Sequence, residues 1–305
     1  MKLGYLFSGQ GKQFAGMGHD LYQQEPIYRQ TIEEASQILG KDMSDSKIFD
    51  DPANTQVSIV TLSTGIYRIL EHDLGQPVGA TGLSLGEYSG IIAANGLSFE
   101  DGLPLVRDRN LYMDQAGHNH PGKMAAVLKA TANIVDEACR VGSQKGPVYP
   151  ANYNTDTQIV IGGSEAGLNA ATDYLHEHGI KRVVPLKMTV ASHTPFMQEA
   201  SDALAKRLQT VEFAEMDFPV ISNTIVKPFT RLNVKQTLVK QLVNPTHFNE
   251  CLKELLNLEA DVLIEIGPGD TLMKFAKTIL CNANKFHIDS VETLNQVRSN
   301  KKLVK

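Results

Sequence analysis

The sequence predicts an α/β fold, with a main domain built on a parallel sheet and a smaller α+β subdomain inserted into it. Short apolar strand patterns alternate with helical patterns along most of the 305-residue chain. Residues 123–188 alone follow the order strand, helix, strand, strand, helix, strand, and the main pattern resumes after them. A unit that opens and closes within one chain in this way is typical of an insertion.

The first elements follow this pattern in order. LGYLF at 3–7 is typical of a buried strand, and the glycine-rich turn SGQGKQFAGMG follows it before helical segments around 20–40. That turn lacks the glycine order of phosphate and dinucleotide loops, so the sequence does not favour nucleotide binding. Residues 55–73 carry apolar residues at helical spacing, and PVGATGLS indicates a strand that enters a turn.

The inserted subdomain is predicted over 122–189. Its strands are KMAAVLKA, VYPANYN, QIVIGG and KRVVPLKM, and its helices are TANIVDEACRVG and EAGLNAATDYLHEHG. The order β-α-β-β-α-β is that of a ferredoxin-like module. The main domain then comprises 1–121 and 190–290, where FPVISN and VLIEIG are further strands, and 291–305 are expected to form a C-terminal tail.

Composition limits the classes of function. The chain has 29 basic and 34 acidic side chains, a net charge of −5 and no blocks of like charge, which disfavours nucleic acid as a partner. Its three cysteines lie far apart, so we expect no disulfide framework, no thiolate metal site and a reducing compartment. No apolar run reaches the roughly 18 residues of a membrane helix, and the N-terminus lacks a signal-peptide core. We therefore expect a cytoplasmic protein without a membrane segment.

Ser84 lies in TGLSLGEYSG between Gly82 and Gly86, after a predicted strand and before a predicted helix. Strand, serine and helix follow one another in this order in a nucleophile elbow. Such a turn would hold the serine in a strained backbone conformation and would aim the N–H of Leu85 at a developing oxyanion. A turn in which Ser84 only caps the helix fits the same residues, so the motif alone leaves both interpretations open.

A serine nucleophile needs a base, and His193 is the candidate among nine histidines. It lies in TVASHTPFM, a turn of small residues after a strand and before a helix, where the insertion rejoins the main domain. His176 and His178 lie on different sides of a predicted helix, so they do not indicate a metal site. Spacing alone does not separate a catalytic His193 from a structural one.

Six segments together resemble the signature blocks of malonyl-CoA:acyl carrier protein transacylases, in the order of that family. They are GQGKQ at 9–13, GLSLGEYSG at 82–90, LVRDRNLYM at 105–113, ASHTPFM at 191–197, QLVNPTHF at 241–248 and EIGPGDTL at 265–272. The resemblance spans about residues 1–285. It implies an α/β-hydrolase-like main domain with an inserted ferredoxin-like α+β subdomain.

The resemblance implies that Ser84 is the nucleophile and His193 the general base. It also implies that the main-chain carbonyl of Gln241 holds the imidazole in place of a triad carboxylate, and that the N–H groups of Gln10 and Leu85 form the oxyanion hole. The implied reaction is ping-pong transfer of the malonyl group from malonyl-CoA to the phosphopantetheine thiol of acyl carrier protein, for fatty acid synthesis, without a metal or redox cofactor.

The resemblance assigns Arg109 to the free carboxylate of the malonyl group, which suits the two parallel donors of a guanidinium. Arg107 is the competitor, but the family's arginine stands four residues before a methionine, here Met113, which would line the same pocket. An isolated arginine more commonly lies on a solvated helix face. Two residues depart from the family: Leu83 replaces the usual histidine of the elbow, and Thr246 replaces a more usual valine.

Three other functions stay open at this point. An acyltransferase of the same fold would serve a polyketide or malonate-decarboxylase system instead. A serine esterase or thioesterase shares G-x-S-x-G, but it normally carries an acid before the histidine in chain order and has no use for Arg109. A non-enzymatic binding module would show no labelling of a serine by an acylating reagent.

Overall fold

The computed structural model describes residues 1–187, 190–279, 284–300 and 303. The chain divides into two compact units, and each unit is built from more than one stretch. The first comprises Met1–Asp108, Val211–Leu232 and Cys251–Lys305, and the second comprises Arg109–Thr210 and Asn233–Glu250. The division falls inside the helices α6 (Phe99–Asn119) and α11 (Phe248–Asn257).

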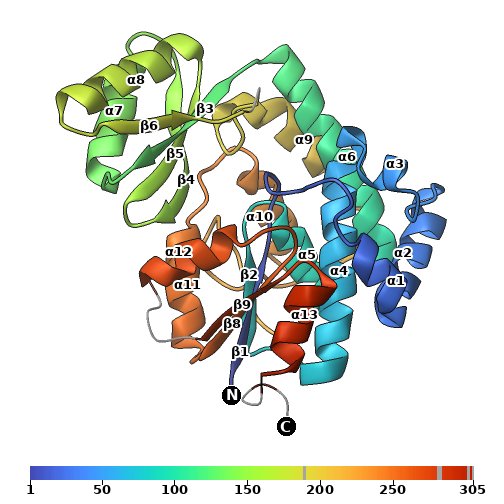
Figure 1. Cartoon of the computed structure of the whole chain (residues 1–305). Coiled ribbons are helices and arrows are strands. Elements are labelled where there is room, and N and C mark those ends of the chain that lie inside the picture. Colours follow the sequence, from blue (N-terminus) through green and yellow to red (C-terminus); the bar gives the residue numbers. More distant parts are fainter. Residues whose placement is uncertain (188–189, 280–283, 301–302, 304–305) are drawn as a thin grey trace. The chain divides into compact units, whose positions relative to one another are not determined.

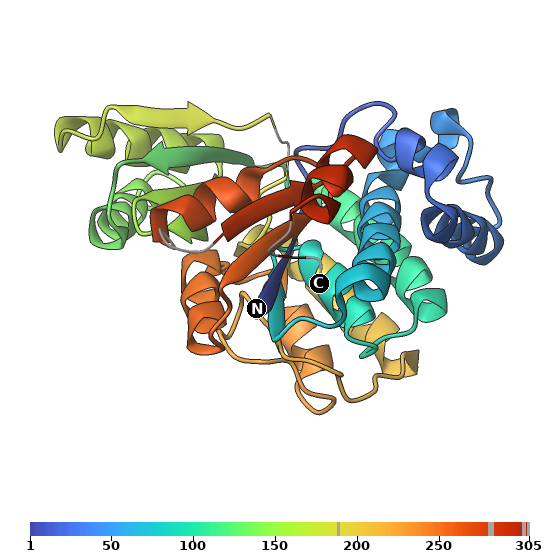
Figure 2. The ribbon, with the colours of Figure 1, turned by 60° about the horizontal axis from the view of Figure 1, so that its bottom comes forward.

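A five-stranded sheet runs through the first unit (Figure 1). Its strands are β1 (Leu3–Phe7), β2 (Gly79–Gly82), β7 (Val220–Ile221), β8 (Val262–Ile266) and β9 (Asn284–Ile288). They follow the order β7-β2-β1-β8-β9, and every neighbouring pair is parallel. Figure 2 shows β8 and β9 side by side. The predicted α/β fold with a parallel sheet is confirmed.

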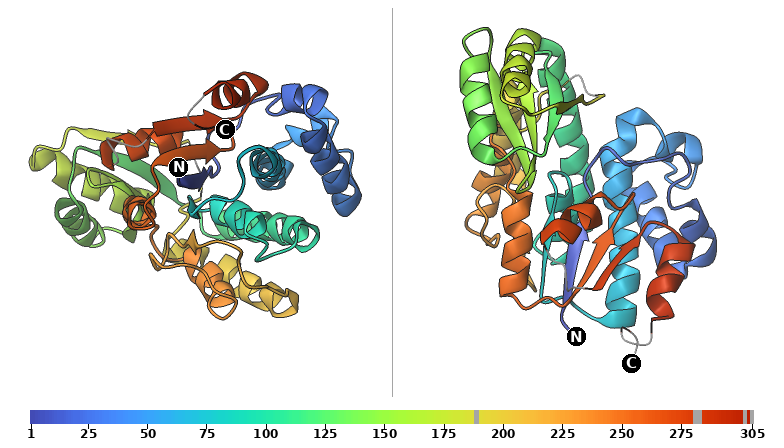
Figure 3. Two further views of the ribbon diagram at one scale, coloured as in Figure 1. Left: turned by 90° about the horizontal axis from the view of Figure 1, so that it is seen from below. Right: turned by 60° about the vertical axis from the view of Figure 1, so that its left-hand side comes forward.

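The central strands of this sheet are buried along their whole length. All residues of β1 and β8 are buried, as the near-continuous apolar runs LGYLF and VLIEI indicate for parallel strands with covered faces. The helix α4 (Thr55–Leu74) packs against β8, α2 (Pro26–Leu39) and α5 (Gly86–Ala93), as Figure 3 shows. Glu265 is the exception in β8, since it places a carboxyl group inside the apolar run.

The second unit contains a separate four-stranded antiparallel sheet. Its strands are β3 (Lys123–Leu128), β4 (Val148–Thr155), β5 (Gln158–Gly163) and β6 (Arg182–Pro185), in the order β4-β5-β3-β6. The helix α7 (Ala132–Gly142) follows β3, and α8 (Glu165–Glu177) follows β5. This is the ferredoxin-like β-α-β-β-α-β arrangement that the sequence predicts.

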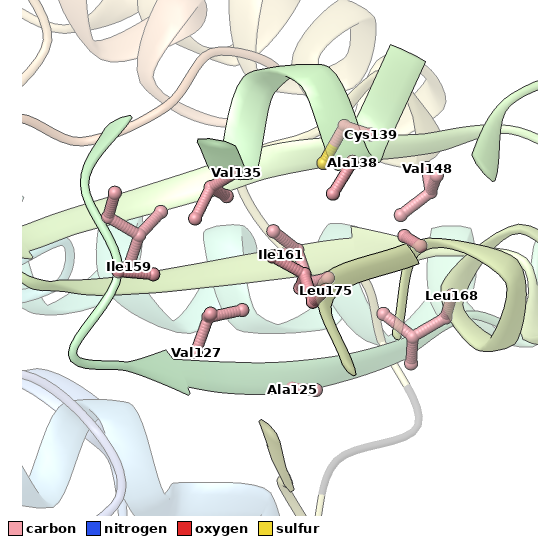
Figure 4. Close-up of a cluster of buried hydrophobic side chains, with 12 residues drawn as sticks. Ala125, Val127, Val135, Ala138, Cys139, Val148, Ile159, Ile161, Leu168 and Leu175 are labelled. Atoms are coloured by element: carbon pink, nitrogen blue, oxygen red, sulfur yellow. The ribbon is translucent and has the colours of Figure 1, made fainter. Parts of the chain in front are cut away.

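This small sheet has a hydrophobic core of its own, shown in Figure 4. Val135 of α7 and Leu175 of α8 are buried in one cluster with Val127, Ile159 and Ile161 of the strands. Full burial of one such aliphatic side chain is worth about 1.5–3 kcal/mol relative to exposure. The cluster therefore stabilises the β-α-β-β-α-β motif from within.

The C-terminal segment differs from its prediction. Residues 291–305, expected as a tail, begin with the helix α13 (Val291–Arg298), which buries Leu294 and Val297. The side chains of Ser290 and Thr293 form a capping box at its start, which is a sequence signal for the beginning of a helix. The strand β9, just before it, was not predicted either.

The helical segments predicted around 20–40 are confirmed as two helices, α1 (His19–Gln24) and α2, which Pro26 begins. One other predicted element is shorter than expected. The strand in FPVISN is reduced to β7, since Pro219 has no N–H for the ladder. The remaining helices among the described residues are α3 (Ser46–Phe49), α9 (Gln198–Arg207), α10 (Val234–Gln241), α12 (Thr271–Ile279) and three 3-10 helices at Pro52–Asn54, Pro195–Met197 and Leu208–Thr210.

The compact unit that holds the small sheet is larger than the predicted insertion. It also includes the second half of α6, α9 and α10, which the sequence analysis assigns to the main domain. The predicted domain boundaries, 1–121 with 190–290 and 122–189, therefore stay a prediction.

Candidate active site

Ser84 lies between β2 and α5 in the left-handed region of backbone conformation, with a φ of 53°. A residue other than glycine rarely adopts this conformation, and such strain is concentrated at functional sites. The predicted order of strand, serine and helix is confirmed. The turn is held to the end of β1, since the N–H of Leu83 donates to the carbonyl of Phe7 at 3.2 Å.

The two glycines of G-x-S-x-G are there because neighbouring backbone leaves no room for a side chain. A Cβ atom at Gly82 would overlap the carbonyl group of Gly86, and one at Gly86 would overlap the carbonyl oxygen of Phe7. Only glycine allows such close approach of main chain. The motif therefore has a steric function in addition to the strain at Ser84.

Leu85 and Gln10 lie on two segments next to the turn. Leu85 directly precedes the first turn of α5, where the N–H groups and the positive end of a helix dipole lie. Gln10 is exposed on the loop after β1, and Gln56 Nε2 donates to its Oε1 at 3.4 Å. A Cβ at Gly9 would lie 2.5 Å from the carbonyl oxygen of Leu83, so this loop passes directly against the elbow.

In the second unit, the ring of His193 is held by main chain. Its Nδ1 lies 2.8 Å from the carbonyl oxygen of Gln241, and both residues are buried. Because a carbonyl only accepts hydrogen bonds, Nδ1 carries the proton and Nε2 is the nitrogen that can take one up. The contact predicted for Gln241 is confirmed. His193 also has a left-handed φ of 61°, so its backbone is strained as well.

Burial lowers the pKa of His193 from 6.5 to about 4. The carbonyl of Gln241 opposes this shift because it favours the protonated ring, and the positive charge of Arg109 reinforces the shift. The imidazole is therefore neutral at physiological pH, as a general base must be before it accepts a proton.

This shift predicts a pH dependence of stability. The folded state favours the neutral ring of His193. The contribution of this ring to the free energy of unfolding is therefore fully present above the unfolded pKa of 6.5, and it is lost as pH falls toward the folded pKa of about 4. We expect the difference in unfolding free energy between wild type and His193→Gln to shrink by about 3 kcal/mol between pH 7 and pH 4. Denaturant unfolding at both pH values measures it, and a constant difference would contradict the shift.

Arg109 is the buried arginine of α6, with 1% of its surface exposed. Its Nη2 donates to Oε1 of Gln241 at 3.2 Å. Arg107, the competitor, is exposed and pairs with the neighbouring Asp108 at 3.2 Å. Met113 is buried four residues after Arg109, on the same face of the helix. The buried contact with Gln241 favours Arg109 over Arg107 for a specific role.

The presence of threonine at position 246, where the family more usually has valine, is explained by a hydrogen bond of its hydroxyl. Its hydroxyl accepts a hydrogen bond from Nδ2 of Asn152 at 2.8 Å, which a valine would not do. The N–H of Tyr153 also donates to the carbonyl of Thr246, and the N–H of Thr246 donates to the carbonyl of Ala151. The segment after Gln241 is thereby attached to β4. Leu83, the other departure from the family, is partly exposed beside Ser84.

Sequence reasoning missed a buried polar link behind the elbow. Glu87, fully buried in α5, accepts from the N–H of Asn223 at 2.5 Å, and Nδ2 of Asn223 donates to the carbonyl of Gly82 at 2.6 Å. The signal was a glutamate inside a helix whose other residues are all buried. Paired in this way, Glu87 and Asn223 fix the backbone of the elbow.

An elbow serine on a parallel sheet and a buried histidine held by a carbonyl are typical of enzymes that transfer or hydrolyse acyl groups. The chain belongs to the acyl transferase domain family, because the sequence model of that family matches residues 4–300.

Its relatives carry a narrower name. The chain is 33% identical to the malonyl CoA-acyl carrier protein transacylase of Bacillus subtilis (strain 168), over 96% of this chain and 95% of that protein. The crystal structure of MCAT from Streptococcus pneumoniae superposes with a TM-score of 0.93 at 38% identity, covering 97% and 98% of the two chains. A malonyl-transacylase in complex with a type II PKS acyl-carrier protein gives a TM-score of 0.91 at 31% identity, covering 97% and 98%.

The length and hydropathy of the helices can also be compared with those of membrane-spanning helices. Among the described residues, no helix combines the length and the apolar character that crossing a membrane requires.

Proposed function

We propose that this protein transfers the malonyl group of malonyl-CoA to the phosphopantetheine thiol of acyl carrier protein, in fatty acid synthesis. The observation that carries the proposal is the double contact of Gln241. Its main-chain carbonyl holds His193, and its side chain holds the buried Arg109. One residue thus positions both a neutral base and a cation suited to a carboxylate.

The proposed reaction has two half-reactions. Ser84 Oγ attacks the thioester carbonyl while Nε2 of His193 takes its proton, and the N–H groups of Gln10 and Leu85 receive the oxyanion. The carbon–sulfur bond then breaks, and the thiol of CoA leaves with the proton from His193. The carrier's thiol next gives its proton to His193 and attacks the malonyl-serine ester. The ester C–O bond then breaks, and His193 returns the proton to Oγ of Ser84.

The malonyl carboxylate is proposed to pair with Arg109, with Met113 lining the same pocket. This pairing has a second effect, because the positive charge of Arg109 contributes to the low pKa of His193. A carboxylate that neutralises this charge removes part of the repulsion against a protonated His193. Malonyl binding would therefore make the imidazole a stronger base than it is in the free enzyme.

The function is tested by intact mass. Incubation with malonyl-CoA is expected to add one malonyl group to the protein, and addition of a carrier protein with its phosphopantetheine arm is expected to remove the group and add it to the carrier. A thioesterase would release free malonate without the carrier. Absence of any adduct would favour a binding module.

Gln241 allows its two contacts to be separated. In Gln241→Ala the main-chain carbonyl that holds His193 is kept, while the side-chain contact with Arg109 is lost. We expect an acylation rate with acetyl-CoA close to wild type and a fall of about tenfold in kcat/KM for malonyl-CoA, the size of one lost hydrogen bond to a charged group.

The backbone control is Leu242→Pro, which moves the carbonyl and is expected to reduce acylation by both substrates. Single-turnover rates with each thioester measure the two effects. An equal loss for both substrates in Gln241→Ala, with the fold intact, would mean that the side chain supports His193 instead.

A polyketide system is the second candidate, because the malonyl-transacylase seen with a type II PKS acyl-carrier protein shares the fold at 31% identity. A malonate-decarboxylase system needs the same half-reaction. Comparison of kcat/KM for carriers from the three systems decides among them. A cytoplasmic location is part of the proposal, and the buried thiols of Cys139 and Cys251 are consistent with a reducing compartment, while Cys281 lies outside the described residues.

A further inference from the structure

Glu265 is a fully buried carboxyl group in β8, and three donors point at it. Ser8 Oγ donates to its Oε1 at 3.0 Å, the N–H of Leu272 donates to the same oxygen at 3.1 Å, and the N–H of Met273 donates to Oε2 at 2.8 Å. Leu272 and Met273 belong to the first turn of α12. The carboxyl group therefore joins the start of this helix to the residue that follows β1.

No cation accompanies this carboxyl group among the ion pairs of the described residues. Burial raises the pKa of Glu265 to about 7, and the nearby charge of Asp270 adds to the shift. A buried polar group of this kind is costly unless its hydrogen bonds are made. Burial of the Glu265 carboxyl group thus costs free energy of folding. A link that served only to hold apolar strands together would not need a carboxyl group.

Ser8 is held on three sides. Its hydroxyl donates to Glu265, and its N–H donates to the carbonyl of Ile266 at 3.0 Å. Gly267, with a φ of 117°, packs so closely that a Cβ there would lie 2.9 Å from the Cβ of Ser8. The position of Ser8 is therefore fixed by the segment from Glu265 to Gly267.

Ser8 is also the first residue of the loop that carries Gln10. Gly9 lies against the carbonyl of Leu83 in the elbow, and Gln10 comes next, two peptide units from Ser8. Consecutive Cα atoms are about 3.8 Å apart, so a shift of Ser8 is passed directly to the N–H of Gln10. Within the first unit, the position of this N–H relative to Ser84 thus depends on Ser8.

We propose that Glu265 is a positioning residue for acyl transfer, which acts through the hydroxyl of Ser8 to place the N–H of Gln10 for the oxyanion. The proposal rests on the proposed function, in which Gln10 and Leu85 stabilise the oxyanion formed at Ser84. Loss of one oxyanion donor costs about a hundredfold or more in rate, and a displaced donor costs part of that.

The test is Ser8→Ala, which removes the hydroxyl and leaves Gln10 and Ser84 unchanged. We expect kcat for malonyl-Ser84 formation to fall about tenfold to hundredfold, while KM for malonyl-CoA stays within about twofold, because the oxyanion contact forms only in the transition state. Rapid-quench mass spectrometry of the adduct measures both. A merely structural role would lower the fraction of active protein and leave the rate constant of the active fraction unchanged.

Ser58→Ala is the matched control. Ser58 is also a buried serine of the first unit, but its hydroxyl donates to the carbonyl of Phe49 at 2.7 Å instead of to Glu265. Its kcat is expected to equal that of wild type. Equal rate constants for Ser8→Ala and Ser58→Ala would overturn the proposal.

Glu265→Gln is the second variant, because it keeps the shape of the side chain but replaces one accepting oxygen with an amide N–H₂, which then faces at least one of the three donors. It is expected to lower kcat as Ser8→Ala does, and the double variant is expected to be no slower than the worse single variant, since the two residues act as one unit. Fully additive losses would overturn the proposal. Failure of the proposed function itself would be recognised separately, as a wild-type adduct that does not map to Ser84.

Discussion

Replacing Ser84 by alanine is expected to abolish the malonyl adduct. The Oγ atom forms the ester in the proposed reaction, and no other atom of the elbow can replace it. The fold should persist, because the strained φ of 53° is imposed by the surrounding backbone and alanine meets the same strain as serine. Intact mass after incubation with malonyl-CoA, followed by peptide mapping of the wild-type adduct, is the measurement.

His193→Ala is the companion variant, expected to slow adduct formation by several orders of magnitude. His118→Ala serves as its control, because His118 is an exposed histidine of the second unit. It should react at the wild-type rate. A malonyl adduct on Ser84→Ala, or a peptide map that places the wild-type adduct elsewhere, would disprove the nucleophile.

Replacing Arg109 by alanine is expected to reverse the preference of the enzyme between malonyl-CoA and acetyl-CoA. The malonyl carboxylate must lose water in a buried site, which is costly unless a cation replaces the lost hydration. The neutral acetyl group never uses the guanidinium, and without Arg109 it no longer shares the site with a buried charge. The ratio of kcat/KM for the two thioesters should fall by about a hundredfold or more, as for a buried charge left without its partner.

Arg107→Ala is the control for this prediction, since Arg107 is exposed and pairs with Asp108 on the same helix. Its ratio should equal that of wild type. Arg109→Lys should be intermediate, because lysine keeps the charge but loses the two-point geometry. A ratio that falls in Arg107→Ala and not in Arg109→Ala would transfer the role to Arg107, and an unchanged ratio in both would contradict the malonyl substrate.

The parts of the site that could be predicted from the sequence are local ones. The elbow needs a strand, Ser84 and two glycines within ten residues, so the pattern is visible in one short string. The β-α-β-β-α-β motif was equally visible, because each of its elements carries its own periodicity. The capping box of Ser290 and Thr293, followed by Val291, Leu294 and Val297 at helical spacing, is a local signal too, although the prediction of a tail does not take it into account.

The remaining parts depend on contacts between residues far apart in the chain. His193 and Gln241 are 48 residues apart, and only the resemblance to a family indicated their contact. The side-chain bond from Arg109 to Gln241 spans 132 residues, and the bond from Ser8 to Glu265 spans 257. Neither periodicity nor spacing carries information about such pairs. Glu265 left one signal, a carboxylate in an otherwise apolar strand.

The attachment of Thr246 to β4 also covers part of an outer edge of the small sheet. β4 is one of the two outermost strands of the four-stranded sheet, β6 being the other, and an exposed outer strand is a template on which a second chain can add. Here the N–H of Tyr153 and the carbonyl of Ala151 are already bonded to Thr246, at 2.7 and 2.9 Å. A neighbouring molecule therefore finds these backbone groups occupied. The segment whose Gln241 carbonyl holds His193 thus also leaves a second chain fewer backbone groups to pair with along this edge strand.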